Sequence, residues 1–167
     1  MPILTGQMLD VISQSEAQTR RLGAHLAESL SPGDVVALVG GLGTGKTRFA
    51  QGVGQGLGIR EAIVSPTFTL VREYSGPGIR IPFFHVDLYR IEHVEETLTF
   101  GLEDYLYGDG VCLIEWADRL ASHQLPTEHL WIDFRHLDQG KRSLLLQPRG
   151  QHYEDLLKSF RQKAYGV

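Results

Sequence analysis

Uninterrupted apolar runs are the clearest pattern in this chain, and they predict buried strands. Residues 35–39 (VVALV) and 111–116 (VCLIEW) are short β-branched and aliphatic runs without the alternation of a half-exposed strand. Such runs are typical of strands that are covered on both faces, as in a parallel sheet. Residues 7–12 (QMLDVI) form a shorter strand candidate near the start of the chain.

Two further pairs of apolar runs flank turn sequences and predict hairpins. Residues 65–74 and 79–91 lie on either side of Gly-Pro-Gly, and residues 129–137 and 141–148 flank Asp-Gln-Gly-Lys. Glycine and proline in these positions favour tight turns. We therefore expect antiparallel pairs in addition to the buried central strands.

Helical periodicity appears between the strands. Leucines recur every four residues in 13–30, where Ser13 or Ser15 is a suitable N-cap. Residues 46–58 and 152–164 are also expected to be helical, and 92–110 predicts a short, broken and charged helix. This order predicts a three-layer α/β domain spanning residues 1–167, with a mixed, centrally parallel sheet and antiparallel edge hairpins.

A phosphate-binding motif follows the first buried strand. Residues 40–47 read GGLGTGKT and match G-x-x-x-x-G-K-[ST], which makes the expected fold similar to that of P-loop NTPases. Backbone N–H groups must wrap the phosphate, and side chains on the loop would obstruct that approach. Lys46 can reach the terminal phosphates and the Thr47 hydroxyl can bind Mg²⁺. The expected contacts are Gly40, Gly41, Leu42, Gly43, Thr44, Gly45, Lys46 and Thr47.

Two carboxylates are candidates for the metal and for catalysis. Glu115 ends a buried strand, so it should emerge at the carboxyl edge of the sheet beside the glycine loop. Asp87 lies within an apolar and aromatic run, where period two places it on one face with His85 and Tyr89. A solvated loop residue is the alternative for Glu115, and a pair with Arg90 or a backbone cap is the alternative for Asp87.

Composition narrows the function classes. The net charge of −4 argues against a dedicated DNA-binding or other nucleic-acid-binding protein, and no run is long enough to span a membrane. The single cysteine, Cys112, lies in an apolar run and is expected to be a buried thiol. We expect a cytoplasmic protein. The chain contains no asparagine and therefore no Asn-Lys-x-Asp guanine motif, which favours ATP over GTP.

Four segments in this order resemble the TsaE (YjeE) family: GGLGTGKT, SPTFTLVREY, HVDLYRI and CLIEW, within a similarity from about residue 8 to 150. The resemblance implies an ATPase required for the threonylcarbamoyl group on adenosine 37 of tRNAs that read codons beginning with A. It implies hydrolysis with the TsaB–TsaD heterodimer as partner, and contact with tRNA only through that complex.

The resemblance also assigns residue roles. Lys46 and Thr47 match the phosphate lysine and the magnesium threonine, and Glu115 matches the second magnesium ligand. Asp87 matches the aspartate implicated in hydrolysis, and Thr67 belongs to a segment compared with a GTPase switch. Residues near the adenine are placed less strictly, with no motif to anchor them: Glu16, Thr19 and Arg142.

Several alternatives remain open at this level. A small-molecule P-loop kinase would need an arginine-rich lid, and a nucleotide-dependent binding module would show no turnover. No arginine occupies a recognisable finger position; Arg72 and Arg90 are the candidates, but the sequence favours ion-pair or surface roles for both. Trp116 is expected to cover the nucleotide, to contact a partner protein, or to pack over the end of the sheet. His85 has the pattern of a packing histidine, with a catalytic base as the alternative.

Overall fold

A mixed sheet flanked by helices forms the frame of the computed structural model, which describes residues 3–5 and 7–166. The strands are β1 (Ile3–Thr5), β2 (Met8–Ser13), β3 (Val35–Val39), β4 (Val71–Tyr74), β5 (Phe83–Asp87), β6 (Val111–Glu115), β7 (His129–His136) and β8 (Arg142–Arg149). The α-helices are α1 (Glu16–Ala27), α2 (Lys46–Gly56), α3 (Leu102–Leu106) and α4 (Gln151–Tyr165). Short 3₁₀ turns are η1 (Val94–Leu98), η2 (Ala117–Arg119), η3 (Ser122–Gln124) and η4 (Asp138–Gly140).

The strand order is β1-β2-β8-β7-β3-β6-β5-β4. The four central strands β7, β3, β6 and β5 are parallel, whereas β4 pairs antiparallel with β5 at one edge. On the other side β8, β2 and β1 continue the sheet in antiparallel pairs. The α/β fold predicted with a centrally parallel sheet and antiparallel hairpins is confirmed; the pairing of β1 with β2 was not predicted.

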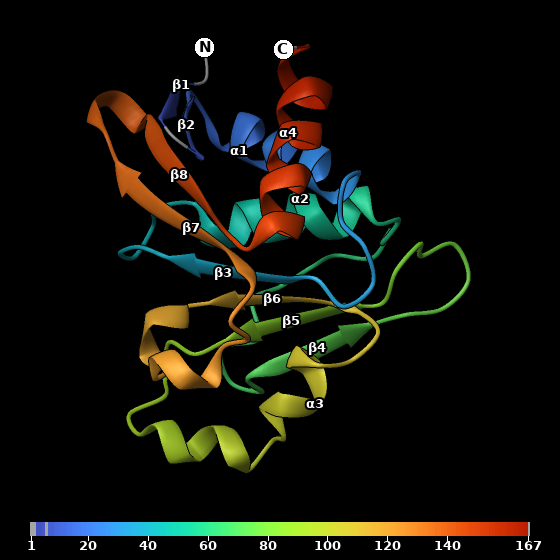
Figure 1. Cartoon of the computed structure of the whole chain (residues 1–167). Helices are drawn as coiled ribbons and strands as arrows, with labels where there is room; N and C mark the ends of the chain where they lie inside the picture. Colours follow the sequence, from blue (N-terminus) through green and yellow to red (C-terminus); the bar gives the residue numbers. More distant parts are fainter. Residues whose placement is uncertain (1–2, 6, 167) are drawn as a thin grey trace.

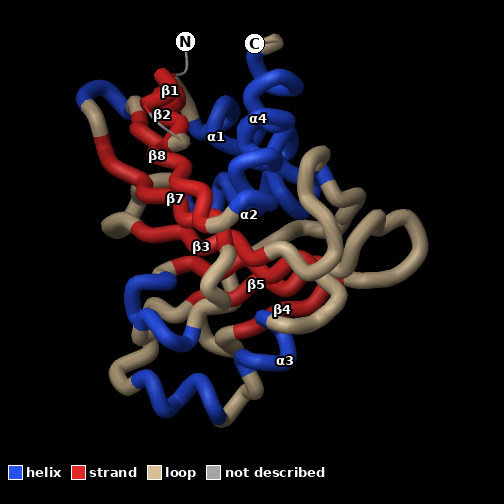
Figure 2. Tube along the Cα trace, in the orientation of Figure 1, coloured by secondary structure: helices blue, strands red, loops and turns tan. Residues whose placement is uncertain are grey.

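Helices cover both faces of the sheet (Figure 1; Figure 2). One core contains Val36 and Leu38 of β3 together with the apolar faces of α1, α2 and α4. The other contains Val35 and Ala37 together with α3 and the segment after β6. The run VVALV therefore lacks alternation because both faces of β3 are buried, as the sequence predicted.

Glycines allow α1 and α2 to pack in close contact. A Cβ atom added at Gly23 would overlap the backbone oxygen of Phe49, and one added at Gly52 would overlap the backbone oxygen of Arg20. The backbones of the two helices therefore touch, with no side chain between them. This contact fixes the helix that begins with Lys46 against the N-terminal part of the chain.

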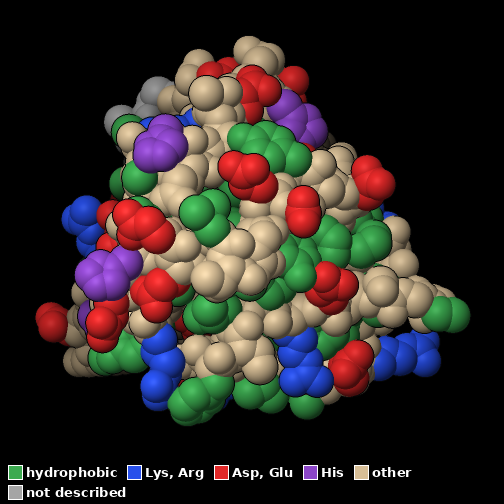
Figure 3. All heavy atoms as spheres, turned by 90° about the horizontal axis from the view of Figure 1, so that it is seen from below, with side chains coloured by type: hydrophobic (Ala, Val, Ile, Leu, Met, Phe, Trp, Pro, Cys, Tyr) green, Lys and Arg blue, Asp and Glu red, His purple; other side chains and the backbone are tan. Residues whose placement is uncertain are grey.

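The layer that contains η1 and α3 forms the face seen in Figure 3, where acidic side chains are interspersed with hydrophobic ones. Glu92, Glu95 and Glu96 are exposed, so the charges of this segment face solvent. Glu96 accepts the backbone N–H groups of His93 and Glu92, and these bonds lower the pKa of its carboxyl. The left-handed Gly101 separates η1 from α3, so the predicted helix is broken here.

The strand predicted over 65–74 begins only at Val71. Ser65 and Thr67 instead direct their hydroxyl groups to Asp87, and Leu70 adopts a left-handed φ of 69°. The run predicted over 79–91 is likewise a strand only in β5. In place of a longer hairpin, the segment before β4 thus forms side-chain hydrogen bonds to Asp87.

Among the described residues, no helix is long and apolar enough to cross a membrane.

Candidate functional site

The glycine loop connects the carboxyl end of β3 to the first turn of α2. Gly40, Gly43 and Gly45 have φ values of 141°, 71° and 106°, which side-chain-bearing residues rarely adopt. A Cβ at Gly45 would also lie 2.9 Å from the Cδ atom of Arg142. The glycines are therefore required by the path of the backbone, and the loop ends at a helix N-terminus that favours an anion.

Lys46 is 4% exposed and folds back onto this loop. Its Nζ donates to the backbone oxygens of Gly40 and Gly41 at 2.6 and 2.7 Å, and it lies 4.2 Å from the centre of the Trp116 ring. Burial lowers the pKa of Lys46, while the charges of nearby carboxylates, Glu115 foremost, act in the opposite direction. The ammonium group is thus held at the base of the loop.

Glu115 ends β6 and lies beside the first turn of α2. The Thr47 hydroxyl donates to Glu115 Oε1 at 2.8 Å, and His85 Nε2 lies 2.6 Å from Glu115 Oε2. The carboxylate is 2% exposed. Glu115 therefore lies at the carboxyl edge of the sheet beside the loop, and it is not a solvated loop residue.

Asp87 is the neighbour of Glu115 in the paired strands β5 and β6. Its Oδ1 accepts the backbone N–H of Tyr89 at 2.9 Å, and its Oδ2 accepts the hydroxyl groups of Ser65 and of Thr67, the latter at 3.3 Å. The backbone cap considered for Asp87 is present. Its carboxylate is 4% exposed, and Ser65 and Thr67 are held on the loop that faces it.

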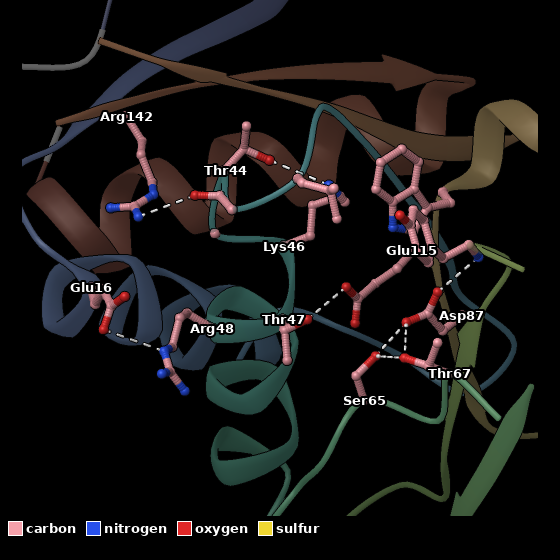
Figure 4. A pocket seen from close by; sticks show the side chains of 15 residues that line it. Glu16, Thr44, Lys46, Thr47, Arg48, Ser65, Thr67, Asp87, Glu115 and Arg142 are labelled. Carbon is pink, nitrogen blue, oxygen red and sulfur yellow. Dashed lines mark hydrogen bonds and ion pairs between the residues drawn. The ribbon is translucent and has the colours of Figure 1, made fainter. Parts of the chain in front are cut away.

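These groups line a cavity of about 460 Å³. Figure 4 shows Lys46, Thr47, Asp87 and Glu115 converging on it from α2, β5 and β6. The lining comprises Glu16, Leu42, Gly43, Thr44, Gly45, Lys46, Thr47, Arg48, Ser65, Thr67, Asp87, Tyr89, Glu115, Trp116 and Arg142. The arrangement combines an amide-rich helix start with two neighbouring carboxylates, a combination suited to an anion that is bound together with a cation.

Of the three residues expected near the adenine, two line one end of this cavity and one does not. Glu16 pairs with Arg48 at 3.4 Å, and Arg142 Nη2 donates to the Gly43 oxygen at 3.3 Å. Thr19 is fully buried and does not line the cavity, since its hydroxyl is 2.7 Å from that of Ser13. Gly40 and Gly41 also do not line the cavity; their backbone oxygens accept hydrogen bonds from Lys46.

The two arginines considered as finger candidates are not part of the cavity lining. Arg90 lies over Phe68, 4.2 Å from the ring centre, and Arg72 lies 5.7 Å from the centre of the Tyr74 ring. Trp116 lines the cavity in a left-handed conformation and also packs against Tyr89 at 5.0 Å. The Trp116 ring therefore lines the cavity and is also packed against the core that contains Val35 and Ala37 of β3.

Sequence reasoning did not assign Arg48 or Tyr89 to the site. Arg48 directly follows Thr47 on the first turn of α2, so its place beside the motif was a usable signal. Tyr89 follows β5 and turns toward the cavity after the strand has ended. His85 was read as a packing histidine; it is fully buried, but its ring also contacts Glu115.

The family model and the related proteins that match this chain carry the same family description. Residues 13–144 match the family model described as threonylcarbamoyl adenosine biosynthesis protein TsaE. Proteins named tRNA threonylcarbamoyladenosine biosynthesis protein TsaE are similar to this chain. The one from Bacillus subtilis is 42% identical over 139 residues, covering 83% of this chain and 85% of the relative. The one from Treponema pallidum is 42% identical over 133 residues, covering 80% and 96%.

A solved structure agrees with these relatives. The crystal structure of YdiB from Bacillus subtilis superposes with a TM-score of 0.80 at 32% sequence identity, and the match covers 98% of each chain. The similarity therefore extends over both halves of the sheet, the glycine loop included. From the matched family model, the sequence identities and the shared architecture, we conclude that this chain belongs to the TsaE family.

Proposed function

We propose that this chain binds ATP with Mg²⁺ in the cavity and hydrolyses it, as its part in forming threonylcarbamoyladenosine in tRNA. The observation that carries the proposal is the convergence of Lys46 and Thr47 with the neighbouring carboxylates of Asp87 and Glu115. The names of the related proteins support the pathway. The chemistry of the site supports the nucleotide.

The phosphates would be held by the loop and by Lys46. In the structure the ammonium group donates hydrogen bonds to oxygens of the same loop, two of them the backbone carbonyls of Gly40 and Gly41. Phosphate oxygens are stronger acceptors because they are charged. We expect Lys46 to exchange carbonyl contacts for phosphate contacts when a nucleotide enters, while the N-terminus of α2 supplies further N–H donors.

The oxygen atoms beside the loop fit a magnesium ion. Thr47 Oγ1 and Glu115 Oε1 lie 2.8 Å apart, and such hard oxygen donors are what Mg²⁺ prefers. Among the described residues, no group of three or more His, Cys, Asp or Glu side chains could hold a metal by itself. Thr47 and Glu115 would hold a magnesium ion at this place, and the ion would supply positive charge next to the phosphate oxygens.

Asp87 is the residue best placed to act on the attacking water. Three donors, from Ser65, Thr67 and Tyr89, keep its carboxylate oriented at the cavity wall. A carboxylate has about four acceptor positions, so one remains for a water molecule. Asp87 would orient that water or accept its proton, and Thr67 beside it would sense the terminal phosphate.

Arg72 and Arg90 do not line the cavity, and the two arginines that do line it, Arg48 and Arg142, contact Glu16 and the Gly43 oxygen. We therefore infer that no arginine among the described residues of this chain is placed to neutralise the terminal phosphate. In related NTPases an arginine supplied by a partner can accelerate hydrolysis strongly. We therefore expect slow hydrolysis by the chain alone and faster hydrolysis with the TsaB–TsaD heterodimer, which would also present the tRNA.

The test measures phosphate release by the purified chain with ATP and Mg²⁺, with and without TsaB–TsaD, and with GTP as the control nucleotide. We expect a slow rate with ATP that rises in the complex. Equal rates with and without the partners would refute partner activation. Absence of any turnover in either case would favour a nucleotide-dependent binding module, and phosphate transfer to an added metabolite would favour a kinase.

The pathway is tested separately in cells. Depletion of the protein followed by mass analysis of tRNA nucleosides should show reduced threonylcarbamoyladenosine. Re-expression of the wild-type chain should restore the nucleoside, and re-expression of Lys46→Ala should not. An unchanged nucleoside level after depletion would remove this role.

A further inference from the structure

His85 is a buried polar side chain that the proposed chemistry has not used. It lies on β5 with 0% exposure, and its ring stacks on Phe83 with centres 5.8 Å apart and an interplanar angle of 23°. Its Nε2 is 2.6 Å from Glu115 Oε2. A ring that only filled space here would not require a nitrogen facing a carboxylate.

The chemistry of the carboxylate sets the direction of this hydrogen bond. An ionised carboxylate only accepts hydrogen bonds, so His85 Nε2 must carry a proton and donate it to Glu115. Within residues 3–5 and 7–166, the other ring nitrogen, Nδ1, is buried and has no partner. The single polar contact of this ring is therefore directed at Glu115.

The contact sets the orientation of the Glu115 carboxylate relative to the glycine loop. His85 pairs with Leu113 in the sheet and Asp87 pairs with Glu115, so His85 reaches Glu115 diagonally, from the neighbouring strand. With Oε2 bound to His85, Oε1 is directed to Thr47 at 2.8 Å. Strand β5 thus places one carboxylate directly, Asp87, and orients the second through His85.

We propose that His85 is a positioning residue whose Nε2–H holds the Glu115 carboxylate in the orientation that serves Thr47 and a bound magnesium ion. This inference rests on the proposed function, because it gives His85 a role only in the metal-dependent part of nucleotide binding. Hydrogen-bonded partners that orient metal ligands commonly change metal affinity or activity by about 10- to 100-fold when they are removed.

The experiment measures ATP affinity by calorimetry in Mg²⁺ and in EDTA for three variants. His85→Leu removes the donor and keeps an apolar side chain, whereas His85→Gln retains an N–H near the position of Nε2. His129→Leu is the matched control, because His129 is 6% exposed, also has a buried ring nitrogen without a partner among the described residues, and does not line the cavity.

We expect His85→Leu to lose about tenfold or more of the gain in affinity that Mg²⁺ provides, with the affinity in EDTA unchanged. His85→Gln should recover most of that gain, and His129→Leu should retain all of it. An equal Mg²⁺ gain in His85→Leu and in the wild type would overturn this inference alone. Absence of MgATP binding by the wild type would overturn the proposed function and this inference with it.

A second measurement does not depend on a variant that folds. A long-range ¹H–¹⁵N NMR spectrum of the wild-type protein should show His85 with its proton on Nε2. A ring that carries its proton only on Nδ1 cannot donate to Glu115 and would overturn the proposal.

Discussion

The two ends of the parallel strands each contain a buried carboxylate beside a histidine, and the two pairs differ in their surroundings. At the carboxyl end Glu115 meets His85 at 2.6 Å, and at the amino end Asp34 meets His152 at 2.7 Å. His85 is completely buried, whereas the His152 side chain is 48% exposed. The distance between the charged atoms therefore does not distinguish the pair proposed to act in the site from the pair that lies in a turn.

The second oxygen of each carboxylate makes the distinction. Asp34 Oδ2 accepts the backbone N–H of Ser31 at 2.8 Å, which closes the turn before β3. Glu115 Oε1 instead accepts the hydroxyl of Thr47, which belongs to the glycine loop. Asp34 thus accepts a hydrogen bond from the backbone of its own turn, whereas Glu115 accepts one from a side chain that lines the cavity.

The largest effect is expected from Glu115→Gln, which keeps the shape of the side chain and removes its charge. ATP turnover should fall about 100-fold or more, because the magnesium ion proposed beside the phosphates would lose its charged ligand. The urea midpoint should change little. Phosphate release and urea unfolding monitored by circular dichroism measure the two quantities, and a turnover within about fivefold of the wild type would contradict the role given to Glu115.

The opposite result is expected from Asp34→Ala at the amino end. Loss of the acceptor for Ser31 and His152 should lower the free energy of unfolding by about 1–3 kcal/mol. Turnover should be unchanged at a temperature where the variant is folded. A variant that lost turnover without losing stability would show that both ends of the sheet contribute to the chemistry.

A pH dependence should sharpen the comparison, because His129 begins β7 at the amino end. Burial lowers its pKa from the usual 6.5, the hydrogen bond to the Pro126 oxygen opposes this, and Arg149 adds to the lowering. Between the lowered pKa and 6.5 the unfolded chain binds a proton that the folded chain does not, so stability falls as the pH drops below 6.5.

The measurement compares melting temperatures of the wild type and His129→Asn from about neutral pH to about pH 5. The wild type should lose more stability on acidification, because asparagine does not titrate. Parallel curves for the two proteins would show that His129 keeps an ordinary pKa.

The smallest effect concerns Cys112, which lies on β6 between the two ends. Burial raises the pKa of its thiol to about 12, and its side chain is inaccessible. Thiol reagents should label the folded protein only through unfolding, so the labelling rate should increase with urea in step with the unfolded fraction. Rapid labelling without urea would show that the β6 core opens locally.

The sequence was sufficient to predict the α/β fold, since continuous apolar runs such as VVALV and VCLIEW, the first followed directly by the glycine loop, are compatible with few other folds. It also predicted the position of Glu115 at the end of its strand. The stretch 65–70 was misread as strand because its hydroxyl groups bond to Asp87, and a contact between segments so far apart leaves no local pattern.

Site residues contributed by side-chain packing were the hardest to predict. Thr19 was placed near the adenine only from the family resemblance, and the structure instead shows its hydroxyl in contact with that of Ser13. Tyr89 enters the cavity after β5 has ended, where strand periodicity no longer applies. The contact of His85 with Glu115 depends on the register between β5 and β6, which no single strand specifies.

The backbone contact between α1 and α2 has a mechanical consequence. Because a Cβ atom at Gly23 or Gly52 would overlap the backbone of the facing helix, a larger residue at either position would force the two helices apart. Such a separation would displace the start of α2, where Lys46 and Thr47 lie. The shape of the glycine loop thus depends on two glycines that never touch the cavity.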